Sequence, residues 1–273
     1  MFIFLIMIIS VDLNITNNFF SKVLLTLKYK IMNTTETLQQ LQQLKLQGMV
    51  SSYRAQLDLP IHQQLEAHEL IAQLVQAELL NRNNERTNYF LKLAKLRLQA
   101  MPEHIECSAA RNLTKQQLAT LLEGQYIRSG ESVLISGPTG CGKSYLACAL
   151  GYQACLQGYK VLYMNMHRLI EKITLAKLDG SYIKLLNHFE RVPLIILDDF
   201  GLQPLDQTIR VALLQIMEDR YAKKSVIITS QLPVAKWHTY INEPTLADAI
   251  LDRLTAKAQR IELKGESMRR KKQ

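Results

Sequence analysis

Residues 137–144 read Gly-Pro-Thr-Gly-Cys-Gly-Lys-Ser, which is a complete phosphate-binding loop. The loop follows a short apolar run, Val133 to Ile135, and precedes a stretch of helical composition that starts at Tyr145. Its glycines permit a tight turn, so that consecutive backbone N–H groups and the N-terminus of the next helix point at a β-phosphate. The alternative is a glycine-rich turn without a ligand, which the strand and helix context disfavours.

The loop predicts a P-loop NTPase whose cofactors are ATP and Mg²⁺. Lys143 is expected to reach the β- and γ-phosphate oxygens, and the Ser144 hydroxyl is expected to ligate Mg²⁺. The predicted nucleotide-binding residues are Gly137, Pro138, Thr139, Gly140, Cys141, Gly142, Lys143, Ser144 and Tyr145.

A second motif lies downstream, where residues 193–199 read Pro-Leu-Ile-Ile-Leu-Asp-Asp. An apolar run that ends in two carboxylates is typical of a central parallel strand that delivers acids to its carboxyl edge. Asp198 is therefore predicted to hold Mg²⁺, and Asp199 to orient or deprotonate the attacking water. The alternative is that the two aspartates cap a helix or face solvent.

Composition constrains the partners and the compartment. The net charge of +9 and the isoelectric point near 9.3 favour a polyanionic partner, although many basic proteins merely stay soluble. The cysteines form no CxxC pair and have no histidine at metal-binding spacing; they are Cys107, Cys141, Cys148 and Cys155. We therefore expect reduced thiols in a cytoplasmic protein.

The first thirty-one residues differ from the rest of the chain. Residues 1–9 are almost wholly apolar, but nine residues are too few to cross a bilayer and no basic region precedes them. We interpret residues 1–31 as a non-functional extension from an upstream start codon, with Met32 beginning the working protein and no membrane contact. The alternative is a membrane anchor or a signal peptide.

Two domains are predicted after the extension. Residues 32–106 are rich in Leu, Gln, Ala and charged side chains, with breaks at Pro60 and Pro102, and predict a small all-α domain. Residues 107–273 alternate short β-branched runs with helical stretches, which predicts an α/β fold with a three-layer parallel sheet. The expected strands are 132–136, 160–165, 193–198, 225–229 and 260–263, with one strand–helix unit over 160–190.

Basic and aromatic residues mix near the end of the helical domain. They are Arg82, Arg86, Lys92, Lys95 and Arg97, with Tyr89 and Phe90 between them. The basic residues do not share one helix face, so contact with nucleic acid and a solvated helix surface both stay open.

From Met32 onward the chain resembles the insertion-sequence ATP-binding helper family (IstB-like), which is related to the DnaC-type helicase loaders of the AAA+ superfamily. The motifs that carry the resemblance are Leu-Gln-Gln-Leu-Lys-Leu-Gln-Gly-Met, the phosphate loop, Leu-Ile-Ile-Leu-Asp-Asp-Phe-Gly, Ile-Ile-Thr-Ser-Gln-Leu-Pro-Val, Ile-Leu-Asp-Arg-Leu and Leu-Lys-Gly-Glu-Ser-Met-Arg-Arg. The resemblance implies a self-assembling ATPase that binds double-stranded DNA and assists a transposase encoded by the same element.

The resemblance also implies three further roles. Gln231 matches a sensor of the γ-phosphate, with a satisfied loop amide as the alternative. Arg253 matches an arginine finger that reaches the ATP of a neighbouring subunit in a homo-oligomer, with a salt bridge to Asp252 or Asp248 as the alternative. Arg269 matches a second sensor, although a disordered basic tail explains it almost equally well. Where the superfamily usually has Glu, this chain has Asp199, so we expect weak hydrolysis.

Three functions compete at this point. The favoured one is a DNA-stimulated ATPase that helps a transposase in target selection. A DnaC-like loader of a replicative helicase would use the same ATPase residues and differ in its partner. A non-enzymatic scaffold would hold ATP as a structural ligand.

Overall fold

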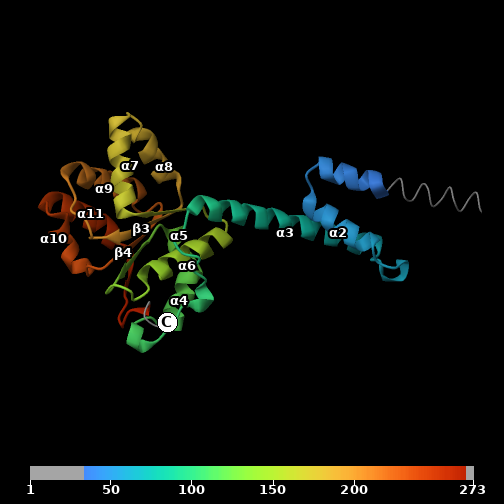
Figure 1. Cartoon of the computed structure of the whole chain (residues 1–273), viewed down its shortest axis with the longest axis horizontal. Coiled ribbons are helices and arrows are strands. Elements are labelled where there is room, and N and C mark those ends of the chain that lie inside the picture. Colours follow the sequence, from blue (N-terminus) through green and yellow to red (C-terminus); the bar gives the residue numbers. More distant parts are fainter. Residues whose placement is uncertain (1–33, 269–273) are drawn as a thin grey trace, which may run out of the picture. The chain divides into compact units, whose positions relative to one another are not determined.

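The computed structural model describes residues 34–268, which form two compact units that meet within one helix (Figure 1). The division falls between Glu85 and Arg86, inside α3 (Ala67–Ala94). The sequence placed the domain boundary after residue 106 instead. Residues 86–106 group with the second unit because Phe90, Ala94 and Ala100 are buried in its core. The interpretation of residues 1–31 as an extension lies outside the described residues.

The helical unit holds residues 34–85. It contains helical residues 34–43, α2 (Gln47–Leu57), η1 (Ile61–Gln63) and the first part of α3. Gly48 lies where α2 crosses α3, because a Cβ added there would come within 2.4 Å of the Ala77 carbonyl oxygen. The Gly48 N–H donates to the buried Glu78 carboxylate at 2.9 Å, and the hydrogen bond from Arg82 lowers the pKa of that carboxyl group. The glycine of the Gln-Gly-Met motif thus allows close packing of α2 on α3, and the N–H groups at the start of α2 are capped by the Glu78 carboxylate.

The sheet unit, residues 86–268, is built on five parallel strands in the order β2-β3-β4-β1-β5. Their bounds are β1 (Ser132–Ser136), β2 (Val161–Asn165), β3 (Leu194–Phe200), β4 (Ser225–Ser230) and β5 (Ala258–Glu262). All five predicted strands are present, and β3 continues two residues past its predicted end. Because β1 is flanked by β4 and β4 by β3, the carboxyl ends of these three strands meet at one edge of the sheet.

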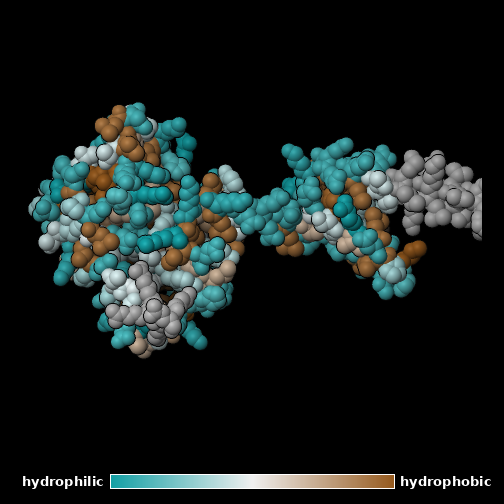
Figure 2. All heavy atoms as spheres, viewed as in Figure 1, coloured by the Kyte–Doolittle hydropathy of each residue, from teal (hydrophilic) through white to brown (hydrophobic). Residues whose placement is uncertain are grey.

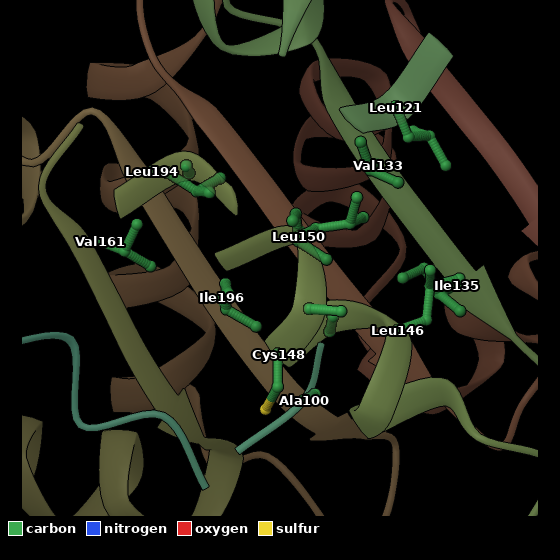
Figure 3. Packing of buried hydrophobic residues seen from close by; sticks show 14 of the residues in the cluster. Ala100, Leu121, Val133, Ile135, Leu146, Cys148, Leu150, Val161, Leu194 and Ile196 are labelled. Atoms are coloured by element: carbon green, nitrogen blue, oxygen red, sulfur yellow. The ribbon is translucent and has the colours of Figure 1, made fainter. Parts of the chain in front are cut away.

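Helices cover both faces of the sheet. One face carries the end of α3, α4 (Lys115–Leu122), α5 (Gln125–Ser129) and α6 (Lys143–Leu156), packed on Val133, Ile135 and Ile196 (Figure 3). The other carries α7 (Met166–Leu178), α8 (Tyr182–Arg191), α9 (Gln207–Arg220), α10 (Trp237–Ile241) and α11 (Pro244–Thr255), packed on Leu134 and Ile195. Short turns η2 (Pro102–His104), η3 (Ala109–Arg111) and η4 (Val234–Lys236) join some of them. The predicted three-layer P-loop α/β core with a small helical unit is confirmed.

The connection from β2 to β3 differs from the prediction. Two helices, α7 and α8, replace the single expected helix, because Gly180 adopts a φ of +77° and breaks the helical run. Large apolar side chains are exposed around this break, namely Leu175, Leu178 and Ile183, and Figure 2 shows apolar surface at the end of the α7–α8 pair. Within residues 34–268 no helix combines the length and the apolar character needed to cross a membrane.

The four cysteines are free thiols that mostly serve packing. Cys148 and Cys155 are fully buried on α6, where burial raises the pKa of Cys148 to about 11 and that of Cys155 to about 12. Both thiols therefore carry little thiolate near neutral pH.

Candidate functional site

The phosphate loop joins β1 to α6 at the carboxyl edge of the sheet. Gly140 and Gly142 have φ values of 82° and 92°, which a side-chain-bearing residue rarely adopts. Gly142 is the N-cap of α6, and no side chain of the described residues caps that helix, so its first N–H groups suit an anion. The Lys143 ammonium is largely buried and donates to the Pro138 carbonyl at 2.8 Å, so it lies across the loop.

Three segments brace the loop. Arg111 donates to the Cys141 carbonyl at 2.8 Å, the Met268 N–H to the Gly140 carbonyl at 3.1 Å, and the Gly137 N–H to the Ser230 carbonyl at 3.2 Å. No motif pointed to Arg111, because it lies at the end of the short turn η3, thirty residues upstream of its partner in the loop. These contacts preorganise the curved backbone that a triphosphate requires.

Two of the predicted contact residues face other parts of the protein. The Thr139 hydroxyl donates to the Gln231 side-chain oxygen at 2.8 Å, which places Gln231, directly after β4, beside the loop. The Tyr145 hydroxyl accepts a hydrogen bond from the Met101 N–H at 3.3 Å. Gln231 is thus hydrogen-bonded to the phosphate loop, a location that both the sensor role and the alternative of a satisfied loop amide allow. Tyr145 connects α6 to the segment after α3.

Asp198 is fully buried and hydrogen-bonded on both carboxylate oxygens. Its Oδ1 accepts from the Ser144 hydroxyl at 2.9 Å and from the Thr229 hydroxyl, and its Oδ2 accepts from the Tyr163 hydroxyl at 2.5 Å. The sequence analysis did not single out Tyr163, which an apolar strand pattern gives no reason to choose. Burial raises the pKa of Tyr163, so it stays a neutral donor to the carboxylate.

A β-bulge turns Asp199 toward the same edge as Asp198. Consecutive side chains of a regular strand point to opposite faces, but the β3–β4 register shifts between Leu197 and Phe200, and Asp199 has a φ of 63°. The Asp199 N–H donates to the Thr229 hydroxyl at 3.2 Å. Asp is among the few residues enriched in this left-handed conformation, which gives a physical reason for its presence where the superfamily usually has Glu.

Both carboxylates face one arginine. Arg97 Nη1 lies 3.4 Å from Asp199 Oδ2 and 3.7 Å from Asp198 Oδ2. Burial and then the neighbouring Asp198 raise the pKa of Asp199, while Arg97 and Lys143 act in the opposite direction. A carboxylate of raised pKa at this location is suited to accept a proton from water. Asp198 neither caps a helix nor faces solvent, so that alternative is wrong for it.

The hydroxyl and carboxylate oxygens of this site fit Mg²⁺. Ser144 and Asp198 supply hard oxygen ligands within hydrogen-bonding distance of each other. Among residues 34–268 no group of three or more His, Cys, Asp and Glu side chains is placed to hold a metal ion. Any magnesium here would therefore depend on these two residues together with water and nucleotide oxygens, as in other P-loop proteins.

Arg253 lies near the amino ends of the strands, whereas the loop lies at their carboxyl ends. It precedes β5, whose first residue pairs with Ser132 at the start of β1, whereas the loop follows the end of β1. Its guanidinium lies 3.2 Å from Glu218 Oε1 and 3.8 Å from Asp252 Oδ2. Asp248 pairs with His238 instead. The ion pair of Arg253 is thus partly exposed and weak. The residue lies near the amino ends of the strands, away from its own phosphate loop. Arg269 lies outside the described residues.

Thr229 supports both acids, so we expect Thr229→Val to weaken the sheet unit. Valine keeps the shape but removes the donor to Asp198 and the acceptor for the Asp199 N–H, which should lower the free energy of unfolding by about 1–3 kcal/mol. The single tryptophan, Trp237, is buried against Phe200, so its fluorescence during denaturation reports this unit. Thr174→Val, which removes one exposed hydroxyl, is the control. Equal stability of both variants and the wild type would contradict the role of Thr229.

The sheet unit shares its fold with replication proteins of known structure. DnaA bound to AMPPCP and single-stranded DNA matches with a TM-score of 0.52 and 18% identity, covering 63% of this chain and 52% of that one. The DnaC helicase loader matches with a TM-score of 0.51 and 20% identity, covering 63% of this chain and 100% of that one. Identities this low show a shared fold alone.

Relatives with higher identity come from insertion sequences. The insertion sequence ATP-binding proteins y4pL and y4uH of Sinorhizobium fredii are 43% and 45% identical over 234 and 237 residues, which cover 86% and 87% of this chain and 96% of each relative. The ATP-binding protein of insertion sequence IS1162 from Pseudomonas fluorescens is 41% identical, covering 74% of this chain and 88% of its own. The profile of the IstB-like ATP binding protein family matches residues 39–273. The chain therefore belongs to the IstB-like family of insertion-sequence ATP-binding proteins, as its motifs predicted.

Proposed function

We propose that this protein is a magnesium-dependent ATPase that assembles on double-stranded DNA and assists the transposase of its own insertion sequence. The observation that carries the proposal is the meeting of Ser144, Asp198 and Asp199 beside a braced phosphate loop in a chain of this family. The free cysteines fit a cytoplasmic location. The alternative, a helicase loader, shares the DnaC fold and differs in the partner.

The chemistry follows from the positions of these side chains. Loop amides and Lys143 bind the phosphates, and Ser144 and Asp198 hold Mg²⁺, which when bound neutralises phosphate charge. Asp199 orients the attacking water and accepts its proton, and Gln231 lies beside the loop to contact the γ-phosphate end. The shorter side chain of Asp199 lets it approach the water less closely than Glu would, so we expect slow turnover without DNA or partner.

Assembly follows from Arg253. A residue at the far edge of the sheet serves the nucleotide of the next subunit rather than its own, and its exposed ion pair with Glu218 is weak enough to exchange for a phosphate. A head-to-tail interface of this kind generates rings or helical filaments. Nucleotide binding and oligomer formation would then be linked.

DNA contact rests on charge. The chain carries a net charge of +9, which favours a phosphate backbone without reading bases. Of the basic residues near the end of α3, Arg82 and Arg97 pair with acids of this chain, whereas Arg86, Lys92 and Lys95 are exposed. The exposed members are the candidates for phosphate contact.

We expect DNA binding to require ATP and to fail in Lys143→Ala. This substitution removes the ammonium that reaches the phosphates, so the nucleotide-bound assembly does not form. Binding of a labelled duplex by anisotropy, with and without ATP, measures the effect, and Lys236→Ala, which removes an exposed lysine, is the matched control. Equal DNA binding with and without ATP would contradict the proposed link between nucleotide binding and assembly on DNA. If a replicative helicase, rather than the transposase, increased this DNA binding, the result would favour the helicase-loader function.

For Arg253→Ala we expect retained ATP binding and a loss of hydrolysis of roughly a thousand-fold or more. Because the finger acts across an interface, mixing Arg253→Ala with Lys143→Ala should restore up to about one quarter of wild-type turnover per subunit, the share of interfaces that combine an intact loop with an intact finger. The measurement is phosphate release by each variant and by the mixture. Unchanged turnover of Arg253→Ala would show that the finger is misassigned, and an inactive mixture would argue against action between subunits.

A further inference from the structure

Arg97 is the residue for which the sequence and the structure give different roles. The charge pattern places Arg97 among the basic residues that are candidates for DNA contact, yet its guanidinium lies against the two adjacent acids of β3. It follows the end of α3 by three residues, after a left-handed turn at Lys95, whose φ is 49°. Its side chain is 49% exposed, so it has room to leave the acids without disturbing the core.

The backbone around Arg97 is anchored, although its side chain is not. Ala94 and Ala100, on either side of it, are buried in the core, and Leu96 packs against the same cluster. The Met101 N–H donates to the Tyr145 hydroxyl on α6, one residue after Ser144. Residues 95–101, which we term the linker segment, are therefore fastened to the helix that carries the phosphate loop.

Arg97 faces the carboxylates that a divalent cation would need. Asp198 Oδ1 is 2.9 Å from the Ser144 hydroxyl, and Asp198 Oδ2 faces Arg97. Two adjacent carboxylates repel each other unless a cation lies close to both, and Arg97 Nη1 is such a cation. A magnesium ion brought by the nucleotide would take over this neutralisation and compete with the guanidinium for Asp198.

We propose that Arg97 is a positioning residue of the ATPase site, which holds Asp198 and Asp199 together before nucleotide binds and releases Asp198 when magnesium nucleotide arrives. This inference rests on the proposed function. Release of Arg97 frees a cationic side chain on the linker segment, which connects the end of α3 to the rest of the sheet unit. Binding of magnesium nucleotide thereby changes the position of a charged side chain close to the end of α3, where the exposed basic residues lie.

The test is binding of a fluorescent ATP analogue, N-methylanthraniloyl-ATP, to the full chain over a range of Mg²⁺ concentrations. Without its cationic competitor, Arg97→Gln should reach half-maximal magnesium-dependent binding at a Mg²⁺ concentration about 2–5-fold lower than the wild type, as expected for loss of a partly exposed ion pair. Arg97→Lys should remain near the wild type. Lys236→Gln removes one exposed lysine charge without touching the acids and should shift the value by less than about 2-fold.

Hydrogen exchange gives a second readout, which already distinguishes the two nucleotide states in the wild type. In the wild type, the amides of Arg97, Leu98 and Gln99, which lie between the anchored residues, should exchange faster with magnesium nucleotide than with nucleotide and a chelator. In Arg97→Gln the amides of residues 97–99 should exchange fast under both conditions. Trp237 fluorescence checks that each variant is folded. An unchanged or higher Mg²⁺ requirement in Arg97→Gln would overturn the inference while leaving the proposed function standing. Absence of nucleotide binding by the wild type would instead defeat the proposed function itself.

Discussion

The site depends on one backbone feature, the bulge that places Asp198 and Asp199 at the same edge of the sheet. A regular strand would send one of the two carboxylates to the opposite face. The left-handed φ of Asp199 and the register shift beside it bring both acids within ion-pairing distance of Arg97. Thr229, on the neighbouring strand, accepts the amide hydrogen that the bulge would otherwise leave unpaired and donates to Asp198. The Thr229 hydroxyl therefore stabilises both the bulge in β3 and the carboxylate of Asp198.

The fold explains why the residues of the candidate site come from distant parts of the sequence. Parallel strands β1, β3 and β4 end at one edge, so Ser144, Asp198 and Gln231 lie around the phosphate loop although about ninety residues of chain separate the first from the last. The same parallel order sends Arg253 to the other edge, away from its own loop. This location is compatible with the proposed action of Arg253 on the nucleotide of a neighbouring subunit.

Much of this was predictable from the sequence. The phosphate loop and the apolar run before the two aspartates are local patterns, and both the strands and the α/β class follow from them. The bulge at Asp199 was not predictable, because a left-handed residue inside a strand depends on a hydrogen bond that its N–H donates to a different strand. Tyr163 and Arg111 were missed for a similar reason. Tyr163 binds Asp198 and Arg111 binds the Cys141 carbonyl, and each partner lies thirty or more residues away in the sequence. Charge patterning misled at Arg97, whose acidic partners lie about a hundred residues downstream.

The account stands on the binding of magnesium nucleotide by this loop and these acids. The most direct measurement is calorimetric titration of the full chain with ATP, once with Mg²⁺ and once with a chelator. The account predicts one binding site per chain with higher affinity when Mg²⁺ is present, because Ser144 and Asp198 then contribute ligands. A chain that shows no affinity for magnesium ATP would contradict it.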